Sequence, residues 1–295
     1  MKKVTKILIG VLIGAVVLAG GSIATISIIN AVNKKAAEKA MNVNPEDHKS
    51  DTASLLDEYN NDPNKEFSIA DLVNIGLEKY KQCDNCYSFG VGTASTVVSQ
   101  SIRSAQIKNG DKYFEESVSY SLMEKIATRT YQNGENGQTD TYIGEAINSL
   151  KGKYPEEPVH YSYSDYKESW GKNLDEVFIY VISNDTVDKE NSKAEKLDNG
   201  NIQISLRLDN EISTYYYKKQ MKTISNLDTY PIFKRVDHVY TFSSDLKLLS
   251  CSVDEEYKVT KKITVTVKNK INYTYHYDEY LKIPEMGENL DYPEK

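Results

Sequence analysis

An apolar run near the start of the chain is the strongest hydrophobic feature of the sequence. It extends over residues 7–29 without a charged residue, and three lysines precede it. About 20 apolar residues span a bilayer core as a helix, whereas a cleavable signal peptide has an apolar core of about 7–15 residues before a small-residue cleavage site. Residues 1–30 therefore predict a signal anchor that crosses the membrane as a helix, or a signal peptide cleaved near Ala19.

The polar segment that follows predicts a tether outside the cytoplasm. Residues 31–66 are rich in Asn, Asp, Lys and Glu and contain Pro45 and Pro63, so they offer little apolar surface for a core. A six-residue basic head is easily kept inside, and the long acidic remainder is then exported. We expect a single-pass protein of the cell membrane with an extracytoplasmic C-terminal domain, or a secreted protein if the head is removed.

Hydrophobic periodicity changes from helical to alternating after residue 67. Ser68 is a good N-cap, and apolar positions recur at helical spacing from there to Gln82, which predicts an amphipathic helix. From residue 87 to residue 143 the alternation has a period of two, and Asn109 with Gly110 forms a strong hairpin signal. No helical pattern separates these strands, so they predict an antiparallel meander.

The rest of the chain predicts a mixed middle and a second meander. Helices are predicted at 161–170 and after Asn210, and strands at 177–183 and 202–208. Residues 233–277 alternate between apolar or aromatic and polar positions, and Pro284 ends this pattern before an acidic tail, 285–295. We therefore predict one α+β domain over residues 67–284: a large, curved antiparallel sheet, an incomplete barrel, with a few helices packed on its apolar face.

Composition narrows the class of protein. Hydrophobic residues make up 39% and charged residues 27% of the 295 residues, and the mean hydropathy of −0.56 excludes a polytopic membrane protein. The formal net charge of −7 argues against a nucleic-acid partner. The same charge does not hold the domain to an anionic membrane surface, so membrane contact is expected only through residues 7–29.

Cys83 and Cys86 have the spacing of a redox motif, but they follow a helix instead of preceding one. The helix dipole disfavours a thiolate at that end, so we expect a structural disulfide and not a redox centre. Such a bridge joins Cys83 to Cys86, or joins one of them to Cys251, and the odd count leaves one thiol unpaired. A buried free thiol is the simplest interpretation of Cys251.

No residue pattern points to catalysis, a metal or a cofactor. The four histidines are isolated in the sequence, and it contains neither a Gly-x-Ser-x-Gly motif nor a phosphate-binding loop. The acidic run Asp254, Glu255 and Glu256 offers too few ligands for calcium and predicts a solvated turn. We therefore expect a non-catalytic protein without a metal or cofactor.

Tyrosine is unusually frequent, with 23 residues against 6 phenylalanines and 1 tryptophan. It suits half-buried sheet faces because its ring packs while its hydroxyl stays in water. The tyrosines therefore fill an aromatic-rich core, or they line a concave surface that accepts an apolar ligand such as an acyl chain. The candidates for that lining are Val118, Tyr120, Trp170, Val236, Tyr240, Phe242, Val265, Val267, Tyr273, Tyr275 and Tyr277.

The order of these elements resembles a known superfamily. A membrane-targeting head and an amphipathic helix come first, then a meander containing Ile107-Lys-Asn-Gly-Asp-Lys-Tyr-Phe114, then a late helix and a final meander that ends in Lys282-Ile-Pro284. This pattern is similar to that of the bacterial lipoprotein carriers and lipoprotein-sorting proteins. The resemblance implies an incomplete antiparallel barrel, closed by helices, around a hydrophobic cavity for acyl chains. No site residue is carried over from that superfamily.

These features predict a membrane-tethered, extracytoplasmic and non-catalytic protein of the bacterial envelope that binds a lipid or another hydrophobic ligand. The alternative is a structural or protein-interaction domain of the envelope, with a filled core and an envelope protein as its partner.

Overall fold

The computed structural model describes residues 34–290 apart from 97, 123–124, 135–136, 226 and 262. Its strands form one sheet in the order β6-β5-β4-β3-β2-β1-β12-β11-β10-β9-β8, with β7 paired to β5. The strands are β1 (Asn85–Ser95), β2 (Ser99–Asn109), β3 (Lys112–Tyr120), β4 (Lys125–Asn133), β5 (Gln138–Ala146), β6 (Gly152–Lys153), β7 (Val159–Tyr161), β8 (Lys193–Lys196), β9 (Ile202–Arg207), β10 (Ile232–Phe242), β11 (Leu248–Lys261) and β12 (Ile263–Tyr277). The helices are the 3₁₀ helix η2 (Pro45–His48), α2 (Thr52–Asn61), α3 (Ile69–Gln82), α4 (Tyr163–Trp170) and α5 (Tyr215–Ser225).

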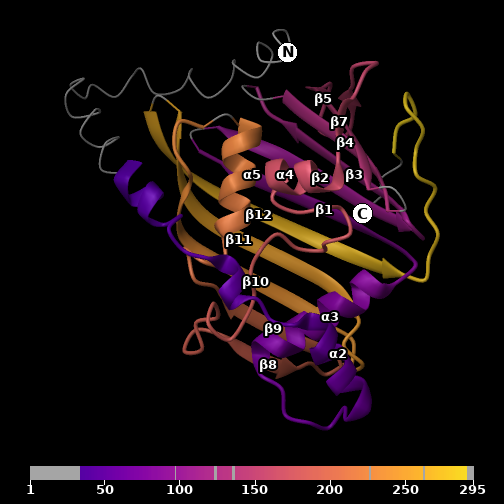
Figure 1. Ribbon diagram of the computed structural model, residues 1–295, viewed down its shortest axis with the longest axis vertical. Coiled ribbons are helices and arrows are strands. Elements are labelled where there is room, and N and C mark those ends of the chain that lie inside the picture. Colours follow the sequence, from indigo (N-terminus) through magenta and orange to yellow (C-terminus); the bar gives the residue numbers. More distant parts are fainter. Residues whose placement is uncertain are drawn as a thin grey trace.

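Two meanders meet where the first strand pairs with the last. β1 and β12 are antiparallel neighbours, from Cys86 opposite Tyr277 to Ser95 opposite Lys268. This pairing joins the N-terminal strands, β1–β7, to the C-terminal strands, β8–β12, in one curved sheet (Figure 1). β6 and β8 stand at opposite ends of the strand order, so the prediction of a large antiparallel sheet that does not close is confirmed.

The two faces of the sheet differ in what covers them. We call inner the face that carries α3, α4 and α5, which lie on one side of the strands in Figure 1, and outer the opposite face. α3 begins with the predicted N-cap: Ser68 Oγ accepts a hydrogen bond from Asp71 N at 3.1 Å, and the Asp71 carboxylate accepts one from Ser68 N. Gly76 lets α3 approach the sheet, because a Cβ there would overlap the ring of Phe242.

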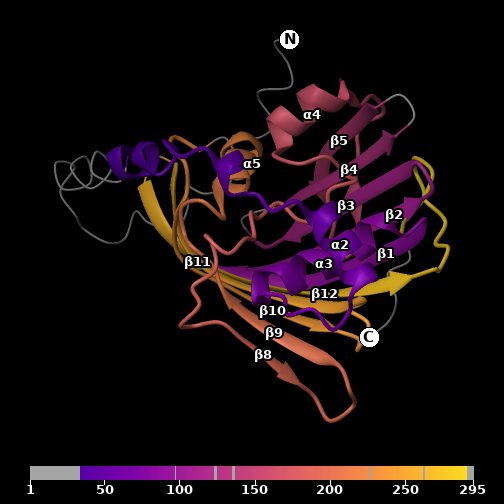
Figure 2. The same ribbon diagram turned by 60° about the horizontal axis from the view of Figure 1, so that its bottom comes forward.

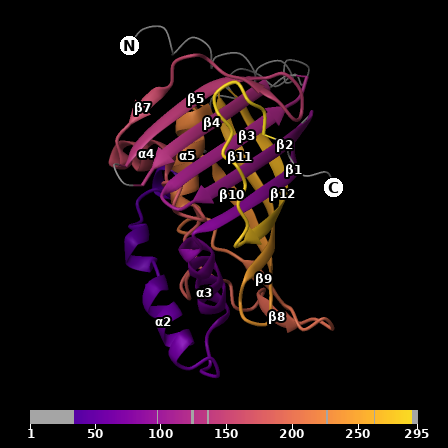
Figure 3. The same cartoon turned by 90° about the vertical axis from the view of Figure 1, so that its right-hand side faces the viewer.

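The C-terminal strands bury their inner face, and the N-terminal strands bury their outer face. The main core packs α3 onto inner residues of β9–β11, such as Ile204 and Tyr240. Two smaller cores lie on the outer side of the N-terminal strands. They contain Phe89, Ala105, Ile107, Phe114 and Leu290 in one cluster and Val118, Ala127 and Ala146 in the other. In Figure 3 the C-terminal segment, drawn in yellow, crosses the outer side of β1–β4.

This reversal corrects one part of the sequence prediction. Helices cover the apolar face of the C-terminal strands, as predicted. The apolar face of the N-terminal strands is instead covered by the C-terminal segment, from which Leu281, Ile283 and Leu290 pack onto the strands. The acidic tail therefore contributes Leu290 to a core.

Residues 34–66 are more ordered than the predicted flexible tether. α2 lies within this segment and has ten residues. It begins after Asp51, whose carboxylate accepts a hydrogen bond from Ser54 N at 3.1 Å, and it buries Leu56 in the main core beside α3. A short helix is marginal alone, so packing against α3 explains the difference.

Residues 177–183 are not the predicted strand. α4 ends at Trp170, and the following Gly171 has a φ of 79°, the left-handed conformation common just after helix ends. The chain then crosses the inner face without regular structure, as Figure 2 shows between α4 and the strands. It is held by tertiary bonds: Val181 N donates to Ser213 O at 2.9 Å, and Asn74 Nδ2 donates to Ile182 O at 2.9 Å. We call residues 177–183 the strap.

Within residues 34–290, as far as the structure describes them, no helix is both long and apolar enough to cross a membrane. The predicted anchor over residues 7–29 lies outside the described residues.

A cavity on the inner face as candidate binding site

A cavity of about 420 Å³ lies on the inner face where the N-terminal and C-terminal strands meet. The sheet forms its floor from β4 across to β11, and α5, Trp170 and the strap lie over it. The volume is within the ~300–1,000 Å³ typical of small-ligand sites. A second hollow of about 890 Å³ lies between the β2–β3 turn and residues 280–285, and its lining residues are mostly polar.

The part of the cavity formed by the C-terminal strands is apolar and aromatic. Apart from Asn269, its lining residues are Val253, Tyr257 and Val259 of β11 and Val265, Val267, Ile271, Tyr273 and Tyr275 of β12. Tyr217 and Met221 extend this wall from α5, where a spacing of four residues places them on one side of the helix.

The part formed by the N-terminal strands is mostly polar, with Ala94, Ile102 and Ile126 as its apolar members. Ser104 of β2, Ser117 of β3 and Thr128 of β4 lie directly opposite one another in the register of the sheet, and all three line the cavity. We call these three residues the hydroxyl row. The same row continues through Gly90 of β1 to Tyr273 of β12, where the apolar wall begins.

Gly90 lies between the two walls and keeps the floor open. A Cβ at this position would lie 2.6 Å from a ring carbon of Tyr273 and would also overlap Ser104 Oγ. Contacts that short are essentially forbidden, so the ring of Tyr273 lies beside the hydroxyl row only because β1 has no side chain there.

The strap lies over the cavity and is fixed to the sheet by aromatic and polar contacts. The ring of Tyr180 packs edge-on against His238 with centroids 4.5 Å apart. Its hydroxyl donates to Glu255 Oε1 at 2.6 Å. Phe178 packs against the same histidine. Tyr180 and Phe178 therefore both line the cavity and hold the strap in place.

Glu255 is a buried carboxyl group held by neutral donors. Besides Tyr180, Asn269 Nδ2 donates to Glu255 Oε2 at 3.1 Å. Burial raises the pKa of Glu255 to about 7. The prediction of a solvated turn at residues 254–256 is wrong, because these residues lie within strand β11. Asp254 and Glu256 point outward and form ion pairs on the outer face, whereas Glu255 points inward.

His238 and Asn269 each keep one buried atom without a hydrogen-bond partner among the described residues. His238 Nδ1 lies 2.9 Å from the Tyr240 hydroxyl, whereas Nε2 has no partner. Burial lowers the pKa of His238 to about 3, so the ring is neutral. Asn269 is 3% exposed and lines the cavity, and its Oδ1 has no partner.

The charged side chains that line the described part of the cavity are Lys172 and Glu115. Lys172 Nζ donates to Glu115 Oε2 at 3.1 Å, and Gln106 Nε2 donates to the same carboxylate at 2.7 Å. These contacts fix the chain after α4 to the polar wall and leave that end of the cavity without net charge.

The predicted lining residues are divided between three places. Trp170, Val265, Val267, Tyr273 and Tyr275 line the cavity. Val236, Tyr240, Phe242 and Tyr277 lie on the inner face within or against the main core, and they do not belong to the cavity lining. Val118 and Tyr120 are on the outer face, in the cluster with Ala127.

Sequence reasoning missed the strap and the face of α5. Val177, Phe178, Ile179 and Tyr180 line the cavity, although the apolar run that contains them predicts a strand. The four-residue spacing of Tyr217 and Met221 is the sequence signal that could have identified the side of α5 that lines the cavity.

All three cysteines are free thiols in the structure. Cys86 in β1 and Cys251 in β11 are separated by β12, and adjacent strands lie about 4.8 Å apart. Their Cα atoms are therefore farther apart than the ~7 Å limit for a disulfide, so this pairing does not suit the sheet order. Burial raises the pKa of the Cys86 thiol to about 12, which disfavours a reactive thiolate.

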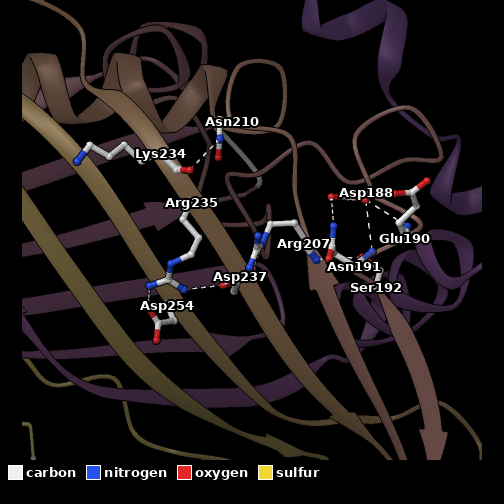
Figure 4. A network of polar contacts seen from close by, with 10 residues as sticks. All are labelled: Asp188, Glu190, Asn191, Ser192, Arg207, Asn210, Lys234, Arg235, Asp237 and Asp254. Carbon is white, nitrogen blue, oxygen red and sulfur yellow. Dashed lines mark hydrogen bonds and ion pairs between the residues drawn. The ribbon is translucent and has the colours of Figure 1, made fainter.

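The outer face of the C-terminal strands carries charges instead of a core. Arg207 pairs with Asp237, and Arg235 bridges Asp237 and Asp254, as Figure 4 shows. These groups are partly exposed and already paired with one another, so they form a solvated face. No cluster of three or more metal-binding side chains occurs among the described residues.

Comparisons with known proteins leave the family open. No family model matches the chain. No curated protein matches it. Among solved structures, the crystal structure of a LolA superfamily protein from Nitrosomonas europaea is similar, with 11% identity over 70% of this chain and 93% of that chain and a TM-score of 0.24. A TM-score this low carries no argument, so the site rests on the contacts described above.

Proposed function

We propose that the protein binds the acyl chain of a lipid, or a similar hydrophobic ligand, in the inner-face cavity and performs no catalysis. The observation that supports this proposal most directly is the apolar wall of β11, β12 and α5, which lines one side of a cavity of about 420 Å³. Removing apolar surface from water stabilises a complex by about 25 cal/mol per Å² before the cost of ordering the ligand. A chain of matching width is therefore the simplest occupant.

We further propose that residues 7–29 tether the domain to the cell membrane, with the domain on the extracytoplasmic side. The apolar run and its basic head support this proposal. Two reporter enzymes fused to the C-terminus test this location. The fusion to an enzyme that is active only outside the cytoplasm is expected to be active. Activity of a fusion to an enzyme that works only in the cytoplasm would overturn the location.

Lipid analysis of the purified full chain tests ligand binding. After mild extraction from native membranes, mass spectrometry is expected to find a lipid class enriched with the protein over the bulk membrane extract. Val265→Phe narrows the apolar wall and should reduce that enrichment. Thr266→Phe is the matched control, because Thr266 is the next residue of β12 and is exposed on the opposite face.

The expected result is loss of enrichment in Val265→Phe alone. Equal lipid content in both variants and in the wild type would show that the lipid is not in the cavity. No enrichment in the wild type would favour the alternative of an envelope interaction domain.

A further inference from the structure

The two walls of the cavity have opposite chemistry, and this difference limits the ligand. A hydrocarbon chain satisfies the apolar wall on β11 and β12 but leaves the hydroxyl row, Ser104, Ser117 and Thr128, without new hydrogen bonds. Polar groups that lose water without gaining a partner cost free energy. An occupant with both chemistries would suit the cavity better than a plain chain.

Neighbouring polar rows on the same face show what is special about the hydroxyl row. Gln132 Nε2 donates to Thr139 Oγ1 at 2.8 Å, and Gln132 Oε1 accepts from Leu174 N at 3.0 Å, so the chain after α4 covers that row. In the next row Glu115 is covered by Lys172. The polar residues of the hydroxyl row face the cavity instead.

One buried acceptor interrupts the apolar wall at a distance from the hydroxyl row. Asn269, in the otherwise apolar lining of β12, is 3% exposed, and its Oδ1 has no partner among the described residues. Its Nδ2 is committed to Glu255, so Oδ1 is the atom left to accept. In the strand register Asn269 lies opposite Ala94, four residues along β12 from Tyr273, which is about 13 Å. Asn269 is therefore an acceptor beside the acyl chain, and the hydroxyl row alone defines the site of the head.

The head group of that ligand is expected to carry no net charge. The charged residues that line the described part of the cavity, Lys172 and Glu115, are paired with each other. A charged head would enter without a counter-ion, and burying an unpaired charge is costly.

Building on the proposed function, we propose that the ligand is a neutral acyl amphiphile whose head donates hydrogen bonds through hydroxyl groups, as a monoacylglycerol does. The acyl chain lies against β11 and β12, and the head lies along the hydroxyl row. Gly90 allows the two parts to meet, because no side chain rises from β1 between Tyr273 and Ser104.

Trp170 provides a direct readout, because it is the single tryptophan of the chain and it lines the cavity. The full chain is placed in phosphatidylcholine nanodiscs and titrated with three probes that share a dibromostearoyl chain, whose bromines quench indole fluorescence on contact. The probes are the monoacylglycerol, the methyl ester and the free fatty acid. The first two share the ester bond, but the glyceryl head carries two hydroxyl groups on two further carbons and the methyl head carries none. Partition of each probe into the nanodisc is the same for all variants and cancels when variants are compared.

The test compares Ser117→Ala/Thr128→Val, which removes two hydroxyls of the row, with Thr93→Val, which removes an exposed hydroxyl of β1 that is absent from the cavity lining. In the wild type the monoacylglycerol is expected to quench Trp170 at lower concentration than the methyl ester. The double variant should lose about tenfold of that preference while binding the ester at least as well, and Thr93→Val should behave like the wild type.

Each other outcome has a separate meaning. An unchanged preference in the double variant, or stronger binding of the fatty acid than of the monoacylglycerol, would overturn the neutral hydroxyl head but leave acyl-chain binding intact. Failure of all three probes to quench the wild type would overturn the proposed function itself. If the double variant does not fold, the isosteric Thr128→Val alone gives the same test with a smaller expected loss, about threefold.

Discussion

The N-terminal and C-terminal strands are two meanders of similar geometry that bury opposite faces of one sheet. In the C-terminal strands the inner face holds the core and the outer face carries exposed ion pairs. In the N-terminal strands the outer face holds two smaller cores and the inner face is mostly polar. The cavity lies where the two patterns meet, and this position is why one wall is apolar and the other is hydroxyl-rich.

Each region also buries one glutamate, and the two are stabilised differently. Glu116 of β3 accepts from Arg129 Nε at 2.8 Å and from the Tyr154 hydroxyl at 3.0 Å on the outer face. Glu255 of β11 has only neutral donors on the inner face. The first glutamate is neutralised by a cation and the second by retaining a proton, so they should respond differently to mutation and to pH.

The largest expected effect comes from breaking the buried ion pair of the N-terminal strands. Arg129 and Glu116 are each 3% exposed, so Arg129→Met leaves a buried carboxylate without its cation. The free energy of unfolding should fall by about 3–5 kcal/mol, measured by urea unfolding of the full chain. Replacing both partners, as Arg129→Met/Glu116→Leu, should recover much of this loss.

The matched variant in the C-terminal strands is Lys234→Met, which breaks the partly exposed pair with Glu256. Its loss should be much smaller than that of Arg129→Met, because water screens an exposed ion pair. Similar losses in Arg129→Met and Lys234→Met would contradict the view that the outer face is a core in only one of the two regions.

The next effect is the pH dependence caused by Glu255. Because its pKa in the folded protein is about 7, above the ordinary 4.5, the folded state holds a proton that the unfolded state has lost between these values. Stability from this group is therefore present at low pH and lost as pH rises toward 7, by up to about 1.4 kcal/mol per pH unit. His238 acts in the opposite direction, since its pKa is lowered from 6.5 to about 3 and the unfolded state binds the extra proton in that range.

Single variants should separate these two slopes. Between about pH 4.5 and 6.5, Glu255→Gln should become less stable relative to the wild type as pH falls, because the stabilisation that the wild type gains from its proton is missing. His238→Gln should show the reverse trend over the same range. Unfolding free energies measured at each pH, as differences from the wild type, remove the contribution of other groups. If the free energy of unfolding had the same pH dependence in the wild type and in both variants, neither Glu255 nor His238 would have the shifted pKa described here.

Much of the fold, but less of the site, could be predicted from the sequence. Alternation along a strand defines two faces, but it does not say which face the helices will cover. In β3 the apolar residues are Phe114 and Val118. The assumption that the whole sheet buries the same face therefore led to the wrong prediction that Val118, and not Ser117, lines the cavity. The sequence position of the covering C-terminal segment, far from β3, carries no local signal for this reversal.

Tertiary partners explain the other misses. Val177–Ser183 has the composition of a strand, but none of the described strands pairs with it. Its backbone bonds go to the Asn74 side chain of α3, to Ser213 and to Thr186 and Val187 just beyond it. Glu255 lies in an acidic run, and only its register in β11 shows that it points inward between two outward neighbours. The helix start at Ser68 and the Asn109–Gly110 turn were predictable because their signals are local.

A smaller effect tests the faces directly through a residue that is buried outside the cavity. Val118 is fully buried in the outer core, so Val118→Ala should lower the free energy of unfolding by about 1–3 kcal/mol. It should leave quenching of Trp170 by the monoacylglycerol probe unchanged. Val265→Ala, on the inner wall, should alter probe binding and cost less stability, because Val265 is only partly buried. If only Val118→Ala changed the probe affinity, the binding site would lie on the outer face and not in the inner-face cavity.

The smallest expected effect concerns the three thiols, which lie on and beside the seam between the two regions. Because all three cysteines are free in the structure, the melting temperature of the full chain should not change when a reductant is added. After unfolding without reductant, a maleimide should label three sites per chain, and before unfolding Cys86 should label slowly because burial keeps its thiol protonated. Labelling at one site only would instead reveal a bridge. The pairs to test are then Cys83 with Cys86 and Cys83 with Cys251, because a Cys86–Cys251 bridge would have to cross β12.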